Sequence, residues 1–170
     1  RDDPGRDGGG EGLAEERAER CGLPGLEVTG RPVVDEDDSE DVVGEVVRFL
    51  EGRVQMALGA GIARTNILLD PGFGFGKLMN HNLDLLDGLS AIAALNRPVL
   101  VGLSRKAFIG NVVERPVECR EWGTAAAVAL AVDRGAHILR VHDVAMMIDV
   151  VKMAAALNPR WLSCRQEHDA

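Results

Sequence analysis

The feature that most constrains the fold is an apolar run at residues 67–69 that ends in a carboxylate at Asp70. An unbroken apolar run is typical of a strand buried on both faces, as in a parallel sheet covered by helices. Pro71 cannot donate to a sheet ladder, so the strand should end there. Three glycines separated by two phenylalanines follow before Lys77. Glycines let a loop turn tightly against a ligand, although this stretch alone leaves a plain strand-to-helix turn open.

The glycine-rich loop matches neither of two common phosphate-binding motifs. The dinucleotide fingerprint G-x-G-x-x-G would need a glycine where the chain has Lys77. The nucleotide-binding loop needs Ser or Thr after Gly-Lys, and here Leu78 follows Gly76-Lys77. Any ligand of this loop is therefore held in another way.

A helical pattern precedes this strand. Residues 42–57 carry apolar side chains at helical spacing with charged residues between them, which predicts an amphipathic helix. Asp38 or Ser39 is expected to cap its start, and Gly59 or Gly61 to end it.

Helical and strand patterns alternate beyond Asp70. We expect helices over 83–95, 124–135 and 144–157, with Thr124 and Asp143 capping the last two, and strands over 99–104 and 137–142. Strands therefore recur at roughly the spacing of a βαβ unit. The order predicts an α/β chain with a parallel sheet and right-handed crossovers.

The length limits the architecture. A closed eight-stranded barrel usually needs about 250 residues, and the chain has 170. The pattern thus leaves a small open sheet or part of a barrel. Residues 1–32 are rich in Gly, Arg, Asp and Glu, and we expect a disordered leader there. Residues 33–158 are expected to fold, and residues 159–170 to form a loose tail.

The net charge of −8 is concentrated at one end of the chain. Residues 1–41 carry 5 basic and 14 acidic side chains, so this segment has a charge of −9 and the remainder is near +1. A chain without a basic patch is not expected to bind nucleic acid.

The cysteines are Cys21, Cys119 and Cys164. This odd, widely spaced set predicts neither a disulfide framework nor a zinc site, and thiols of this kind are typical of the cytoplasm. The sequence has neither the apolar core of a signal peptide nor a run of about 18 apolar residues. We therefore expect a cytoplasmic protein that does not bind membranes.

Polar residues gather at the end of each predicted strand. Residues two apart on a strand share a face, so Ser104 lies in phase with Gly102, and Arg140 with His142. Lys106 continues the phase of Ser104 if the backbone stays extended. One polar strand end is usually a solvated surface group, whereas polar ends on three strands predict a site for an anionic substrate.

The histidines show no metal-ligand spacing, so we expect no metal site built by this chain. His81 and His168 are expected at the surface, and His137 at the start of a strand. His142 alone would more often be a structural histidine.

Four motifs together resemble the dihydropteroate synthase family. They are LDPGFGFGK at 69–77, VGLSRKAFIG at 101–110, Arg120 with GTAA at 123–126, and GAHILRVHDV at 135–144. The motifs come in the order and spacing of that family, and the likeness runs from about Val33 to Leu157.

The resemblance implies the C-terminal portion of a (β/α)₈ TIM barrel, with about three βα units and a preceding helix. The family joins 6-hydroxymethyl-7,8-dihydropterin pyrophosphate to 4-aminobenzoate in folate biosynthesis and releases pyrophosphate. Its earlier strands carry an Asn that helps to hold Mg²⁺, and nothing in this chain matches them. Residues 1–32 do not resemble the fifth strand of the family either. The resemblance also implies a homodimer for the full-length enzyme.

The resemblance gives roles to residues at the strand ends. Asp70 would accept hydrogen bonds from the pterin, because a carboxylate can accept two in one plane. Gly102, Lys106 and Arg140 would also contact the pterin. Arg140 and His142 would bind the departing pyrophosphate, and with Lys106 they form the implied catalytic set.

The aminobenzoate side would be shaped by Phe75, Ser104, Lys106 and Ala107. The family often has Ser after the Lys to hold the aminobenzoate carboxylate, and Ala107 stands there in this chain. Its backbone N–H, at the start of a helix, could still bind the carboxylate, so weaker binding is expected rather than none.

Two other readings compete with a synthase fragment. One is a non-catalytic half-barrel that acts only with a partner chain. The other is the pterin-binding domain of a methyltetrahydrofolate-dependent methyltransferase. The Ser104-Arg105-Lys106 stretch favours the synthase over the methyltransferase, and an upstream coding segment for the missing strands would separate the synthase from the non-catalytic half-barrel.

Overall fold

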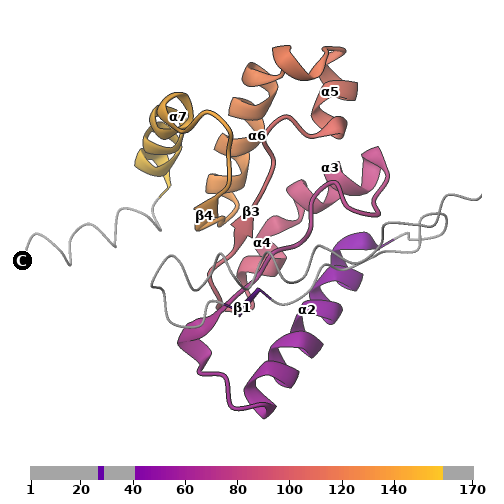
Figure 1. The fold of residues 1–170 in the computed structure, drawn as a ribbon, viewed down its shortest axis with the longest axis vertical. Coiled ribbons are helices and arrows are strands. Elements are labelled where there is room, and N and C mark those ends of the chain that lie inside the picture. The colour runs from indigo at the N-terminus through magenta and orange to yellow at the C-terminus, as the bar shows by residue number, and fades with distance from the viewer. Residues whose placement is uncertain (1–26, 29–40, 159–170) are drawn as a thin grey trace, which may run out of the picture.

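The computed structural model describes residues 27–28 and 41–158 (Figure 1). The helices are α2 Val42–Gly59, α3 Met79–Asp87, α4 Leu89–Ala93, α5 Ala107–Val113, α6 Glu121–Asp133 and α7 Val144–Leu157. The strands are β1 Glu27–Val28, β2 Ile67–Leu68, β3 Leu100–Val101 and β4 Ile138–Leu139, and the 3₁₀ turns are η1 Arg64–Asn66 and η2 Val117–Cys119. In Figure 1, α2 and α7 lie at opposite ends, with β3 and β4 between them.

The strands are short and parallel. β1 pairs with β2, and β3 pairs with β4. A parallel bridge between Leu69 and Val99 links the two pairs, and its Leu69 N–H donates to the Pro98 carbonyl at 2.8 Å. The strands thus follow one another in chain order, which confirms the prediction of a parallel α/β arrangement.

β1 is an addition to the expected elements. Glu27–Val28 lies inside the segment expected to be a leader, yet it pairs in register with Ile67–Leu68. A two-residue strand is too short for a period-two pattern to reveal. The rest of residues 1–32, and the tail at 159–170, lie outside the described residues, so both predictions stay predictions.

Helix α2 ends at Gly59, as expected, but it starts later than expected and has a different cap. The Asp41 carboxylate accepts a hydrogen bond from the Gly44 N–H at 2.9 Å, so the cap is neither Asp38 nor Ser39. The side chains at Val42, Val46, Leu50 and Val54 are buried at the spacing of one helical face. This face joins the main core, whose largest fully buried side chains include Phe73, Leu50, Ile67, Leu85 and Leu103.

The single helix expected over 83–95 is two helices. α3 starts earlier, at Met79, and a break at Gly88 separates it from α4. A Cβ on Gly88 would lie 2.7 Å from a methyl of Val43, so the glycine lets α2 pack closely here. The earlier start also puts His81 one turn before Leu85 on the inward face. His81 is only 4% exposed, so the prediction of a surface histidine was wrong.

Two expected caps also turn out differently. Helix α6 begins at Glu121, so Thr124 lies in its first turn and is buried. Asp143 does precede α7, but its carboxylate makes no capping bond and pairs with Arg105 at 2.8 Å instead. Between β3 and α6 lie two further elements, α5 and η2.

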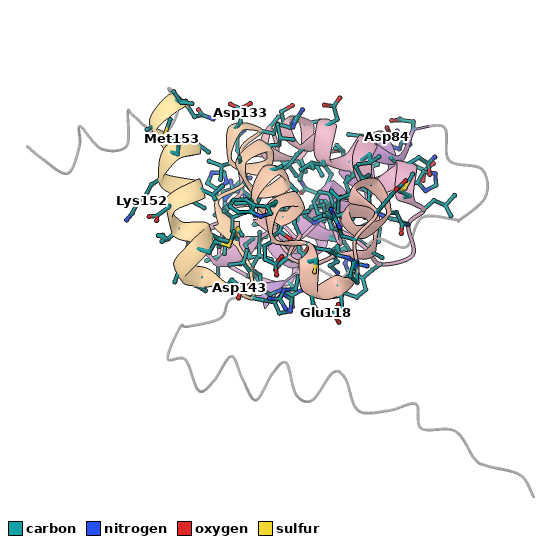
Figure 2. All side chains as sticks on the ribbon, turned by 90° about the horizontal axis from the view of Figure 1, so that it is seen from above. Asp84, Glu118, Asp133, Asp143, Lys152 and Met153 are labelled. Atoms are coloured by element: carbon teal, nitrogen blue, oxygen red, sulfur yellow. The ribbon has the colours of Figure 1, made fainter. Side chains whose placement is uncertain are left out.

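Helix α7 covers one end of the molecule. A small second core of Ala125, Val128 and Met147 joins it to α6. Lys152 and Met153 lie on its outward side (Figure 2), and both are exposed. No helix within 41–158 is long and apolar enough to cross a membrane.

Candidate active site

The carboxyl ends of β2, β3 and β4 meet at one rim, because the three strands are parallel neighbours. A cavity of about 450 Å³ opens there, lined by Gly102, Ser104, Lys106, Arg140, Val141 and His142. Five of the eight residues singled out from the sequence therefore line one cavity. Phe75 adjoins them through Lys106, Asp70 lies at the base of the neighbouring loop, and Ala107 is exposed at the start of α5.

Ser104 and His142 form a hydrogen-bonded pair across β3 and β4. The His142 backbone N–H donates to Ser104 Oγ at 3.2 Å, and the same Oγ lies 2.8 Å from His142 Nδ1. The Ser104 hydroxyl accepts the bond from the backbone N–H, so we assign the hydroxyl as the donor to His142 Nδ1, which is the unprotonated ring nitrogen. This tautomer leaves the Nε2–H of His142 as a donor for a ligand anion.

The Arg140 guanidinium lies close to Gly102. A Cβ on Gly102 would lie 3.0 Å from Arg140 Nη2 and 3.2 Å from its Nε, so a larger residue would push the guanidinium away. Within residues 27–28 and 41–158, no protein acceptor binds this guanidinium. Its planar donor edge suits an oxyanion.

Lys106 joins the cavity to the glycine-rich loop. Its Nζ lies 4.0 Å from the centroid of the Phe75 ring, a cation–π contact. Gly74, at φ +76°, leaves room for it, because a Cβ there would lie 2.8 Å from Lys106 Cδ. The loop glycine therefore lets the ammonium and the ring meet, as well as allowing the turn.

Two side chains that the sequence analysis did not select hold this loop. Asn82 is 2% exposed; its Oδ1 accepts from the Gly74 N–H at 2.7 Å, and its Nδ2 donates to the carbonyls of Lys77 and Leu78. Lys77 Nζ donates to the carbonyls of Gly72 and Phe75 at 3.1 and 3.2 Å. The only hint of this role in the sequence is the amide of Asn82, one turn into the helix that follows the loop.

The charges near the rim are mixed. Burial lowers the pKa of the Lys77 ammonium below its usual 10.5; the Asp70 carboxylate opposes this shift, and Lys106 adds to it. Asp70 Oδ1 also accepts from the Gly72 N–H at 2.8 Å. One carboxylate next to several cations can bind a ligand that has both a donor edge and an anionic group.

The described part of the chain holds no group of three His, Cys, Asp or Glu side chains that could bind a metal ion. No chemical step is assigned to a metal held by this chain.

The family model described as "Pterin binding enzyme" matches residues 28–142. Dihydropteroate synthase of Haemophilus influenzae is 48% identical over 114 residues, which are 67% of this chain and 42% of that protein. The Escherichia coli enzyme is 38% identical over 147 residues, 84% of this chain and 52% of that protein. The chain thus spans about half the length of these relatives.

Solved structures of dihydropteroate synthases are also similar to this chain. Xanthomonas albilineans dihydropteroate synthase with 4-aminobenzoic acid has a TM-score of 0.71 and 45% identity, over 76% of this chain and 48% of that one. The enzyme from Thermus thermophilus has a TM-score of 0.66 and 47% identity, over 71% and 48% of the two chains. The resemblance stated from the four motifs is confirmed: the chain belongs to the pterin binding enzyme family.

Proposed function

We propose that this chain forms the C-terminal portion of a (β/α)₈ dihydropteroate synthase. The complete enzyme would be a transferase that joins 6-hydroxymethyl-7,8-dihydropterin pyrophosphate to 4-aminobenzoate and gives 7,8-dihydropteroate and pyrophosphate in folate biosynthesis. The observation that carries the proposal is that Lys106, Arg140 and the Ser104–His142 pair line one cavity at the strand ends. Solved relatives are described with 4-aminobenzoic acid and with 7,8-dihydropteroate.

The pterin end of the site is assigned to Asp70, Gly102, Lys106 and Arg140. The Asp70 carboxylate accepts the amino and ring N–H groups of the pterin, a two-donor edge that one carboxylate can satisfy. Arg140 stacks on the pterin, and its position against Gly102 supports this role. Lys106 approaches the ring from the side of the glycine-rich loop.

The pyrophosphate end is assigned to Arg140 and His142. The bond between the pterin methylene carbon and the pyrophosphate oxygen breaks, and its electron pair leaves with pyrophosphate. The aniline nitrogen of 4-aminobenzoate then bonds to the cationic methylene and loses a proton to water. The guanidinium and the Nε2–H of His142 stabilise the charge that develops on the leaving group.

The aminobenzoate end is assigned to Phe75, Ser104, Lys106 and Ala107. The Phe75 ring packs on the aminobenzoate ring and holds Lys106 beside it. Ala107 offers no hydroxyl to the carboxylate, so the backbone N–H is the donor left at that position.

The remaining assignments rest on the family resemblance. The complete enzyme uses Mg²⁺, with a protein ligand on strands outside this chain, and it is a cytoplasmic homodimer. The ligands of the complete enzyme are the pterin pyrophosphate and 4-aminobenzoate.

A reconstitution assay tests the proposal. The chain is incubated with both substrates and Mg²⁺, alone and mixed with the N-terminal half of the Haemophilus influenzae relative, and pyrophosphate release is measured. We expect negligible turnover alone and turnover on mixing that is abolished by Lys106→Ala or Arg140→Ala. The control is Lys152→Ala, an exposed lysine on α7, which should leave turnover unchanged.

Two outcomes would contradict the proposal. Near-full turnover by the chain alone would refute the half-barrel reading. Stable association of the two halves without turnover would instead support the non-catalytic half-barrel.

A further inference from the structure

We propose that Arg120, which directly precedes α6, and Thr124, in the first turn of α6, are positioning residues that hold the backbone of Arg105 and Lys106, and so place the Lys106 ammonium at the cavity. Calling Lys106 a substrate-binding residue rests on the proposed function. The geometric part of the inference stands without it.

The backbone at Arg105 needs support from its surroundings. Its φ is +58°, in the left-handed region that residues with a Cβ rarely adopt. A residue stays in that region only where neighbouring groups hold it there. Lys106 follows directly, so its direction depends on this one dihedral angle.

Three side chains bind Arg105, two from the start of α6 and one from the start of α7. Thr124 Oγ1, whose residue is 1% exposed, accepts from the Arg105 N–H at 3.1 Å. Arg120 Nη1 donates to the carbonyls of Arg105 and Lys106 at 3.0 and 3.4 Å. Asp143 pairs with the Arg105 guanidinium at 2.8 Å. The N–H, the carbonyl and the side chain of Arg105 are therefore all bound.

The Arg120 side chain is itself held in place by α5 and the segment that follows it. Its Nε donates to the Arg115 carbonyl at 3.1 Å. A Cβ on Gly110 would lie 2.2 Å from Arg120 Cζ and Nε, so the guanidinium occupies the space that this glycine leaves on α5. In the described residues it pairs with no carboxylate. Its contacts are thus with backbone carbonyls, which suits a role in shaping the loop.

The contact between Lys106 and Phe75 reports whether the backbone of Arg105 is held in place. Lys106 Nζ lies 4.0 Å from the centre of that ring. If Arg105 relaxed to a common φ, the next side chain would turn and the ammonium would leave the ring. Loss of Arg120 or Thr124 should therefore be visible at Lys106, far along the chain from either residue.

Lysine NMR gives a direct test, because the chain has only three lysines, Lys77, Lys106 and Lys152. In the chain labelled with ¹³C-lysine, the CεH₂ protons of Lys106 should be shifted upfield by the ring current of Phe75. Phe75→Leu should remove the shift and identify the signal. We expect Arg120→Gln and Thr124→Val each to lose most of the shift, and Arg120→Lys to keep part of it.

Two further variants separate positioning from a general loss of folding. Arg115→Gln, an exposed arginine five residues before Arg120, should leave the Lys106 signal in place. Gly110→Ala keeps Arg120 but fills its space, and should move the Lys106 signal as Arg120→Gln does. Amide dispersion and the thermal midpoint report the fold of each variant, and Gly110→Ala carries the test if Arg120→Gln does not fold.

The inference is overturned if folded Arg120→Gln and Gly110→Ala chains keep the full upfield shift, or if the parent chain shows none. The measurement uses no substrate, so an absence of synthase turnover leaves it unaffected. In the reconstituted enzyme, Arg120→Gln should lower kcat/KM by roughly a hundredfold, whereas Arg115→Gln should not change it.

Discussion

Single buried side chains decide the shape of the glycine-rich loop. Asn82 accepts from the Gly74 N–H and donates to two carbonyls while almost fully buried. Removing this side chain would take away the side-chain acceptor of the Gly74 N–H and the amide donor to two carbonyls. We expect Asn82→Ala to lower the free energy of unfolding by about 1–3 kcal/mol, measured by urea denaturation. Asn80→Ala, on an exposed position of the same helix, should change it little, and equal effects of the two substitutions would contradict this account.

Lys77 is a second single residue with an effect on stability: it makes the free energy of unfolding depend on pH. Burial lowers the pKa of its ammonium in the folded chain below 10.5, so the unfolded chain binds more protons in the window just below 10.5. Stability therefore rises with pH across that window as the cost of a buried charge is removed. Below the window both states are charged and the cost is present in full.

The test for Lys77 compares the parent chain with Lys77→Met. The free energy of unfolding of the parent should increase relative to the variant as the pH rises from neutral toward 10.5. A constant or falling difference over this range would show that burial does not control the titration of Lys77.

At the scale of elements, α2 packs closely against the glycine between α3 and α4. A Cβ on Gly88 would overlap Val43 on α2, so Gly88→Ala should destabilise the chain by about 1–3 kcal/mol through overpacking. Val43→Ala in the same chain should recover much of this loss, because it removes the methyls that clash. Gly52→Ala is the matched control, since nothing lies within 4 Å of its Cβ position in α2, and it should stabilise by about 0.5–1 kcal/mol. Thermal or urea unfolding of these variants measures all of these effects, and a stabilising Gly88→Ala would contradict the argument.

At the scale of the whole molecule, the chain presents large apolar side chains to solvent. Trp122 is 80% exposed and Leu157 is 73% exposed, and β4 has no further strand beside it among the described residues. Unpaired strand edges and apolar surface favour association. Light scattering should therefore show that the isolated chain self-associates with concentration, and that the N-terminal half of a relative suppresses this. A chain that stays monomeric at every concentration would count against an open half-barrel.

Local chemistry in the sequence determined a large part of this protein. Helical spacing marks α2, and the apolar run before Asp70 marks a buried parallel strand, because periodicity and proline restrictions act within a few residues. Parallel strands align their carboxyl ends, so the polar strand ends were expected at one rim, and Ser104 does bind His142 there. Four motifs in order were enough to indicate the family.

The tertiary structure decided what depends on distant partners. Thr124 and Asp143 were expected to cap their own helices, yet both bind Arg105, which lies 19 and 38 residues away in sequence. Gly88 has no room for a Cβ because Val43 packs on it, and His81 is buried because α3 starts at Met79. β1 pairs with a strand about forty residues later. In each case the outcome depends on contacts with residues distant in sequence, which no short window of sequence contains.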